Sequence, residues 1–365
     1  MSPWTTLFRY IAWQFFICCC IVFFTLAVIV FLLDYVELIR RAGDRSNASL
    51  GMLLELAALK QPYMEQQFLP FVVLFGTMMA FWRLTRSHEL VVARASGISV
   101  WQFLTPPLAC AFFVGVVSVM LFNPIASVMQ ASYENLENRV MRGDDQKFTL
   151  SSTGLWLRQS DDEGNPAIIH AQHFVLGDRA LSNVMFLFLS GDSTLTERID
   201  AKEAVLGPGG WTVKDGYEWR PNEASQPFDS LNIPTNLTPA KIQDSFALPE
   251  TMSFWELPGF IRLLEASGFS SQRHRLYFDA LLARPFLLAA MVLIAASFSL
   301  RMQRSGGVTL MIGAGIASGF LLYFLSDVVF ALGLSATIPT LLAAWTPAGV
   351  SWLVGSSLLL HLEDG

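Results

Sequence analysis

A histidine pair and the four cysteines are the first residues of this chain to consider as metal ligands. His170 and His173 lie three positions apart in a stretch typical of a β-strand, where this spacing points the two side chains to opposite faces. The cysteines all lie inside apolar runs, at positions 18, 19, 20 and 110, and none has a second ligand at the spacing of a zinc site. These residues therefore predict no metal site.

The sequence also lacks the short motifs of enzymes that hydrolyse nucleotides, peptides or esters. No Gly-Lys pair occurs, which excludes a phosphate-binding P-loop, and the patterns H-E-x-x-H and G-x-S-x-G are absent as well. A formal net charge of −6 argues against nucleic acid as a partner. We therefore expect a chain that is not an enzyme, with no catalytic residues and no cofactor.

Charged residues inside or beside apolar runs are the next candidates for function. Asp327 lies within apolar sequence, where a carboxylate costs a few kcal/mol unless it is solvated or paired. It is either a polar point on a substrate path or a residue that reaches the membrane interface, and the sequence leaves both interpretations open.

Arg40 and Arg41 extend the first apolar run in the sequence VELIRRAG. A guanidinium group can bond two phosphate oxygens at once, which suits an anionic lipid headgroup. Glu37, however, precedes the two arginines by three and four residues, the spacing of helical ion pairs. On the residues alone, the favoured interpretation is that Glu37 neutralises them.

The stretch RLTRSHELVVARASGISVWQF, residues 83–103, lies between two apolar runs and contains three arginines. Positions 86–96 would form about three helical turns, with Glu89 in the first turn and Gly97 as the stop. Leu90, Val91 and Ala95 would form a narrow apolar face that fits a groove on a cytoplasmic partner. The alternative is an interfacial loop whose arginines extend toward the headgroups.

Six apolar runs predict the elements that position these residues. With 53% hydrophobic and 15% charged residues the chain is typical of a membrane protein. We expect spans within residues 11–33, 66–82, 100–129, 276–300, 307–332 and 338–361. Arginines fall on one side of the membrane at position 9, in the loop 83–100 and in the turn 301–306. Positive charge gathers on the cytoplasmic side, so both termini are expected in the cytoplasm. The basic residues of loop 34–65 break this rule locally.

Residues between the third and fourth spans change to short β-rich runs separated by glycine, proline and asparagine. We expect strands at 148–158, 167–175, 183–189, 197–206, 211–219 and 228–233. The predicted fold is six transmembrane helices with an all-β periplasmic jelly-roll domain inserted between helices 3 and 4. The expected division is residues 1–132, a β-domain at 133–250, a helical connector at 251–275, and residues 276–365.

Several of these segments resemble the LptF/LptG (YjgP/YjgQ) permease family of the lipopolysaccharide export ABC transporter. They are RYI at 9–11, VELIRRAG at 36–43, SHELVVARASGIS at 87–99, GLW at 154–156 and NLTP at 236–239. The resemblance covers essentially the whole chain, and RRAG and NLTP favour the LptG branch. It implies a permease subunit that extracts lipopolysaccharide from the outer leaflet of the inner membrane and passes it to a periplasmic bridge.

The resemblance also implies partners. They are an LptF-like paralogous permease in a heterodimer, an LptB-like ATPase dimer, an LptC-like single-span protein and an LptA-like periplasmic bridge. It implies that the helix near 86–96 couples to the ATPase through Glu89, together with Arg86, His88, Leu90, Val91 and Arg94. It further implies that Arg40 and Arg41, with Arg45, contact lipid phosphates, and that Phe186 and Phe188 lie on the lipid relay of the β-domain.

Two positions depart from the family pattern, because relatives can carry basic residues where this chain has Asp34 and near Tyr63. These departures put the headgroup contacts in question. A mechanotransmitting ABC permease that moves no lipid through its membrane domain is the alternative function. Such permeases typically have four spans, so the number of spans distinguishes the two.

Overall fold

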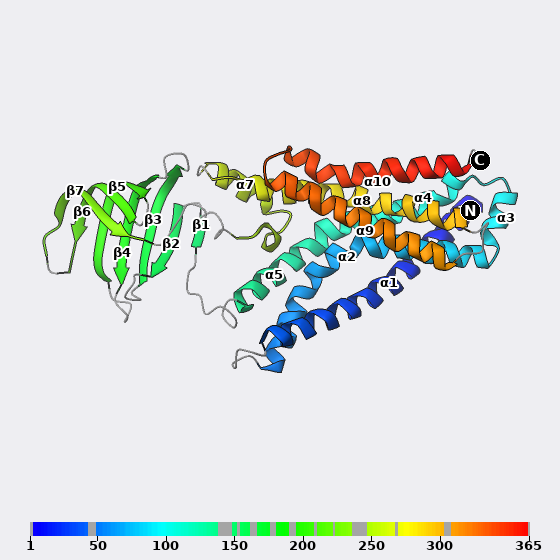
Figure 1. Cartoon of the computed structure of the whole chain (residues 1–365), viewed down its shortest axis with the longest axis horizontal. Coiled ribbons are helices and arrows are strands. Elements are labelled where there is room, and N and C mark those ends of the chain that lie inside the picture. The colour runs from blue at the N-terminus through cyan, green and yellow to red at the C-terminus, as the bar shows by residue number, and fades with distance from the viewer. Residues whose placement is uncertain are drawn as a thin grey trace. The chain divides into compact units, whose positions relative to one another are not determined.

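The computed structural model describes residues 3–42, 49–137, 148–151, 154–160, 166–175, 180–189, 195–207, 210–221, 223–235, 247–266, 269–302 and 308–363. These residues form two compact units. The helical unit contains the N-terminal helices, residues 250–255 and the C-terminal helices. The β unit contains the strands and residues 256–271. Figure 1 labels the elements of both units.

The main helical segments of the helical unit are α1 (Pro3–Ala42), α2 (Leu50–Arg86), α3 (Glu89–Ala95), α4 (Val100–Val117), η1 (Ser118–Phe122), α5 (Asn123–Glu137), α8 (Gln272–Met302), α9 (Val308–Leu334) and α10 (Thr340–Glu363). In the described part of the chain, six stretches of helix are long and apolar enough to cross a membrane. This confirms the expectation of six apolar helices.

Two spans are longer than the sequence suggested. α2 continues through Pro62 and Pro70, although each proline lacks one backbone donor. The third span continues from α4 through the π-helical turn η1 into α5. Side chains bond to two carbonyl groups of this looser turn: Gln66 Nε2 donates to the Ser118 oxygen at 3.3 Å, and Trp255 Nε1 to the Met120 oxygen at 3.1 Å. The Ser118 oxygen also accepts from the backbone amide of Asn123.

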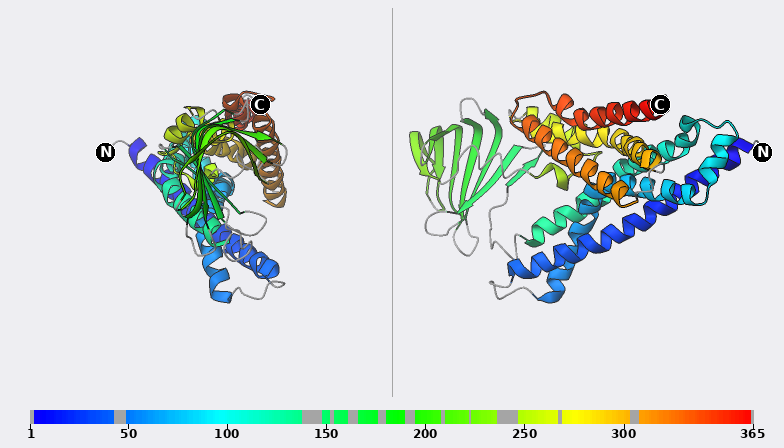
Figure 2. Two further views of the ribbon diagram at one scale, coloured as in Figure 1. Left: turned by 90° about the vertical axis from the view of Figure 1, so that its left-hand side faces the viewer. Right: turned by 45° about the vertical axis from the view of Figure 1, so that its right-hand side comes forward.

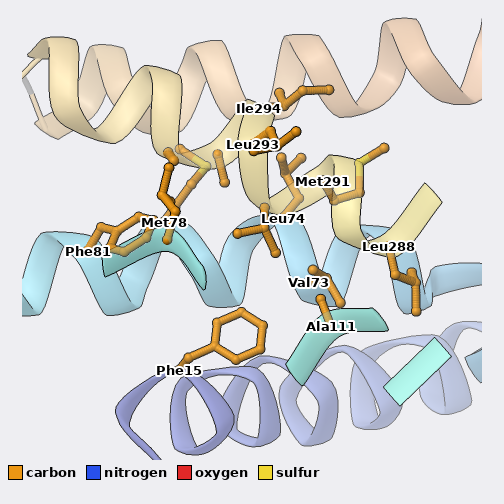
Figure 3. Close-up of a cluster of buried hydrophobic side chains, with 14 of the residues drawn as sticks. Phe15, Val73, Leu74, Met78, Phe81, Ala111, Leu288, Met291, Leu293 and Ile294 are labelled. Carbon is orange, nitrogen blue, oxygen red and sulfur yellow. The ribbon is translucent and has the colours of Figure 1, made fainter. Parts of the chain in front are cut away.

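The core of the helical unit lies where α1, α2, α4 and α8 meet. Figure 3 shows Phe15 of α1, Leu74 and Phe81 of α2, Ala111 of α4 and Leu293 of α8 in one cluster, and all are nearly inaccessible to solvent. Helix α8 passes so close to α4 that a β-carbon on Gly115 would lie 2.5 Å from the α-carbon of Pro285. The absence of a side chain at Gly115 therefore permits this close approach.

The β unit contains β1 (Phe148–Ser151), β2 (Gly154–Ser160), β3 (Pro166–Val175), β4 (Ala180–Leu189), β5 (Leu195–Gly207), β6 (Gly210–Trp219) and β7 (Gln226–Pro234). Each strand pairs antiparallel with the next, so the described strands form one meander in the order β1 to β7. Figure 2 shows that this sheet is curved.

The expected β-structure is present, but its topology differs from the prediction. A jelly roll joins strands in Greek-key order across two sheets, whereas the described strands follow a single nearest-neighbour order. The jelly-roll order is therefore not found among the described residues. Strand spacing predicts where strands begin and end, but it does not predict which strands pair.

Helix α7 (Leu257–Ala266) lies within the segment expected as a connector, and it packs on the sheet. Its Leu264 and the following Phe269 are buried in the same cluster as Ile199, Trp211 and Val213. This part of the connector therefore contributes to the core of the β unit.

Candidate functional site

Helix α3 lies at the end of the helical unit where α1 begins and α10 ends (Figure 1). It is shorter than the predicted helix 86–96, because His88 adopts a left-handed backbone angle, φ 59°, and separates it from α2. Gly97 ends it with φ +82°, and the Ile98 amide donates to the Ala93 carbonyl at 3.2 Å. This is the Schellman arrangement that the predicted glycine stop requires.

The side chains around α3 divide into buried and exposed groups. Leu90 is 6% exposed and packs into the core of the helical unit, so it anchors α3 and does not present a surface to a partner. Glu89 is exposed in the first turn of α3, and His88 is exposed before it. Val92 is 63% exposed, an apolar position that sequence reasoning did not select.

Arg86 does not belong to α3. It ends α2, where its guanidinium lies 5.4 Å from the centre of the Trp82 ring. Val91 and Arg94 are part of α3. The exposed surface of this region therefore combines the carboxylate of Glu89 with the apolar side chain of Val92.

At the other end of α1, Glu37 holds both predicted headgroup arginines. Arg40 donates from Nε and Nη2 to the two carboxylate oxygens, each at 2.8 Å, and Arg41 Nε donates to Oε1 at 2.9 Å. These ion pairs confirm the neutralisation that the i, i+3 and i, i+4 spacing predicted. Arg45 lies outside the described residues.

Asp34, the first departure from the family pattern, has its own partner. Lys60 of α2 donates to Asp34 Oδ1 at 2.5 Å, and both side chains are largely buried. The Lys60 ammonium also lies 5.7 Å from the centre of the Tyr133 ring of α5. Asp34 and Lys60 thus neutralise each other where α1, α2 and α5 meet.

A cavity of about 310 Å³ opens between α2, α8, α9 and α10. Its wall includes Asp327 of α9, so the carboxylate that the sequence singled out faces a cavity. Tyr63, the second departure, lines the same cavity. The remaining polar lining residues are Gln66, Gln67, Glu250, Tyr277, Arg284, Tyr323 and Ser326.

Arg284 and Gln66 form a polar pair in this wall that sequence reasoning missed. The Arg284 guanidinium donates to Gln66 Oε1 at 3.3 Å, and Gln66 is 2% exposed. The signal was available, because Arg284 is a charge inside the apolar run 276–300 and such a charge costs about 3 kcal/mol in a bilayer.

The two aromatic residues expected on the lipid relay lie on β4. Phe186 is fully buried, with its ring centre 6.4 Å from that of Trp211, whereas Phe188 is partly buried beside the same cluster. A lipid would therefore reach Phe186 only after neighbouring side chains had moved apart.

A model of the family described as lipopolysaccharide export system permease LptF/LptG matches residues 9–361. The chain is 25% identical to the lipopolysaccharide export system permease protein LptG of Escherichia coli K12, over 99% of both chains. It is 22% identical to the protein of the same name from Haemophilus influenzae, over 87% of both. This likeness and the six apolar helices together indicate that the chain is a multi-pass inner-membrane protein and a component of a transporter. The chain belongs to the LptF/LptG family of lipopolysaccharide export permeases.

Proposed function

We propose that this chain is the non-catalytic permease subunit that extracts lipopolysaccharide from the outer leaflet of the inner membrane. It forms a heterodimer with an LptF-like paralogue, and the two permeases together enclose a cavity for the lipid. An LptB-like ATPase dimer hydrolyses ATP beneath them. The lipid then moves to the β unit in the periplasm and onward to an LptA-like bridge, while an LptC-like single-span protein associates within the membrane. The observation that carries this proposal is a short helix with an exposed carboxylate, α3, in a chain that has no P-loop.

Helix α3 is suited to transmit force. Leu90 fixes it to the core of the helical unit, and Glu89 and Val92 remain accessible for a partner. A push on the exposed side of α3 would therefore reach α2 and its neighbours through packed side chains rather than through a flexible loop. We place this end, and with it both termini, in the cytoplasm, because the arginines gather there.

The number of spans supports lipid movement over the alternative. A mechanotransmitting permease typically has four spans, and six stretches of the described helices have the length and apolarity of a span. Helix α1 also exposes a long row of apolar side chains, among them Phe24, Leu32 and Leu33. Such a surface suits acyl chains or a neighbouring helix.

Co-purification tests the proposal. The tagged chain, extracted in mild detergent, is expected to carry a paralogous permease, an ATPase and bound lipopolysaccharide. Purification without any ATPase would contradict the proposal and favour a structural or sensory protein.

A further inference from the structure

The cavity between α2, α8, α9 and α10 has the mixed lining of a ligand site. Its volume of about 310 Å³ lies at the small end of the usual range for such sites. Leu287, Met291, Leu322 and Phe330 supply an apolar part of the wall, and Arg284, Asp327 and Glu250 supply charge. An amphiphile with a charged, hydroxyl-bearing head would match both parts.

No carboxylate of the described residues neutralises the charge of Arg284. Among the residues that the structure describes, no carboxylate oxygen lies within the 4.0 Å limit of an ion pair with its guanidinium. Its hydrogen bond goes instead to the neutral Gln66. Arg40, Arg41 and Lys60, by contrast, are all paired with carboxylates. Arg284 therefore keeps donor capacity for an anion that enters the cavity.

Gln66 also fixes the position of this guanidinium. Its amide nitrogen donates to the Ser118 carbonyl at 3.3 Å, which orients Oε1 toward Arg284. The side-chain amide of Asn123 approaches the same oxygen at 3.5 Å. A guanidinium held in place from one side can bond an anion with the rest of its planar fork at little further cost in side-chain entropy.

From this arrangement we propose that the cavity binds a phosphorylated sugar of a membrane glycolipid, with the phosphate on Arg284. The inference rests on the proposed function and assigns one of its lipid contacts. Sugar hydroxyl groups would donate to Asp327 and Glu250, which line the same cavity. The carboxylates repel the phosphate of either ligand, but the sugar hydroxyl groups give the sugar phosphate hydrogen bonds to them that offset this repulsion, so the lining favours the sugar phosphate over inorganic phosphate.

Native mass spectrometry of the full chain, in the complex in which it leaves the membrane, tests this proposal. The probes are a phosphorylated glycolipid, its dephosphorylated form with the same acyl chains, and inorganic phosphate. The wild type is expected to prefer the phosphorylated lipid by about tenfold, the scale of one charge-assisted hydrogen bond. Arg284→Gln should abolish that preference. Arg9→Gln, which removes an exposed arginine near the start of α1, should retain it.

A second variant addresses the possibility that Arg284→Gln fails to fold. Ser326→Glu keeps Arg284 and adds a carboxylate to the cavity wall, so it should also abolish the preference. Full preference in both variants would overturn the proposal, as would equal competition by inorganic phosphate. If Arg40→Gln and Arg41→Gln alone abolish the preference, this inference fails and the proposed function stands. If no form of the chain retains either glycolipid, both fail.

Discussion

The guanidinium of Arg284 in α8 donates to the side-chain oxygen of Gln66 in α2 at 3.3 Å. Gln66 in turn donates to the carbonyl of Ser118 in the π-helical turn of the third span. One glutamine therefore joins three spans: it accepts from Arg284 and adds a second hydrogen bond to a carbonyl that also accepts from the Asn123 amide.

Replacing Gln66 by leucine should destabilise the helical unit. The change removes the hydrogen-bond partner of Arg284, and an unsatisfied buried polar group costs about 1–3 kcal/mol. Thermal unfolding in detergent measures the effect. The neighbouring Gln67 is exposed and bonds only to Tyr63 among the described residues, so Gln67→Leu is the control and should change the unfolding temperature little. Equal losses in the two variants would argue against this role for Gln66.

Replacing Glu37 by glutamine should free Arg40 and Arg41 for the lipid. All three side chains are at least 35% exposed, so solvent screens the ion pairs and stability should hardly change. Affinity for a phosphorylated glycolipid should rise, and the gain should shrink as salt is added. Binding isotherms at two salt concentrations measure this. An unchanged affinity would mean that these arginines do not contact phosphate.

Replacing Gly115 by alanine should loosen the contact between α4 and α8. The added β-carbon would lie 2.5 Å from the Pro285 α-carbon, and overpacking of this kind costs about 1–3 kcal/mol. Gly349→Ala in α10 is the matched control, because no heavy atom lies within 4 Å of its β-carbon position. The control should be neutral or slightly stabilising, since alanine favours helix more than glycine does. Thermal unfolding distinguishes the two, and a stable Gly115→Ala protein would count against the close contact.

Replacing Leu264 of α7 by alanine should destabilise the β unit. Leu264 is fully buried against the sheet, and truncating such a residue costs about 2–5 kcal/mol. Limited proteolysis should then cut the strands faster than in the wild type. Leu263→Ala, at a partly exposed neighbouring position, should have a smaller effect. The same cleavage rate in both variants would show that α7 does not stabilise the sheet.

Local patterns predicted local structure well in this chain. Glycine-rich separators located the strands, and Gly97 marked the end of α3, because both depend on the backbone freedom of single residues. The i, i+4 spacing likewise predicted that Glu37 holds Arg41. The pairing of β1 to β7 as a meander was not predictable, since it depends on contacts between distant segments.

The cavity was foreseen only in part. Hydropathy singled out Asp327, but it could not reveal that Arg284 and Tyr63 share its cavity, because helix packing brings α2, α8 and α9 together. Likewise, the apolar pattern of α3 did not indicate that Leu90 is buried and Val92 is exposed. A seven-residue helix has too few turns for its pattern to indicate which face is buried.

Reconstituted lipid transfer tests the central claim most directly. Proteoliposomes containing this chain, its LptF-like partner and the LptB-like ATPase are expected to pass labelled lipopolysaccharide to an acceptor only when ATP is present. Glu89→Lys should reduce transfer more than about tenfold through like-charge repulsion or a lost contact at the partner. Glu55→Lys makes the same exchange at an exposed position near the start of α2 and should leave transfer intact. Transfer without ATP, or equal transfer by the two variants, would contradict the account.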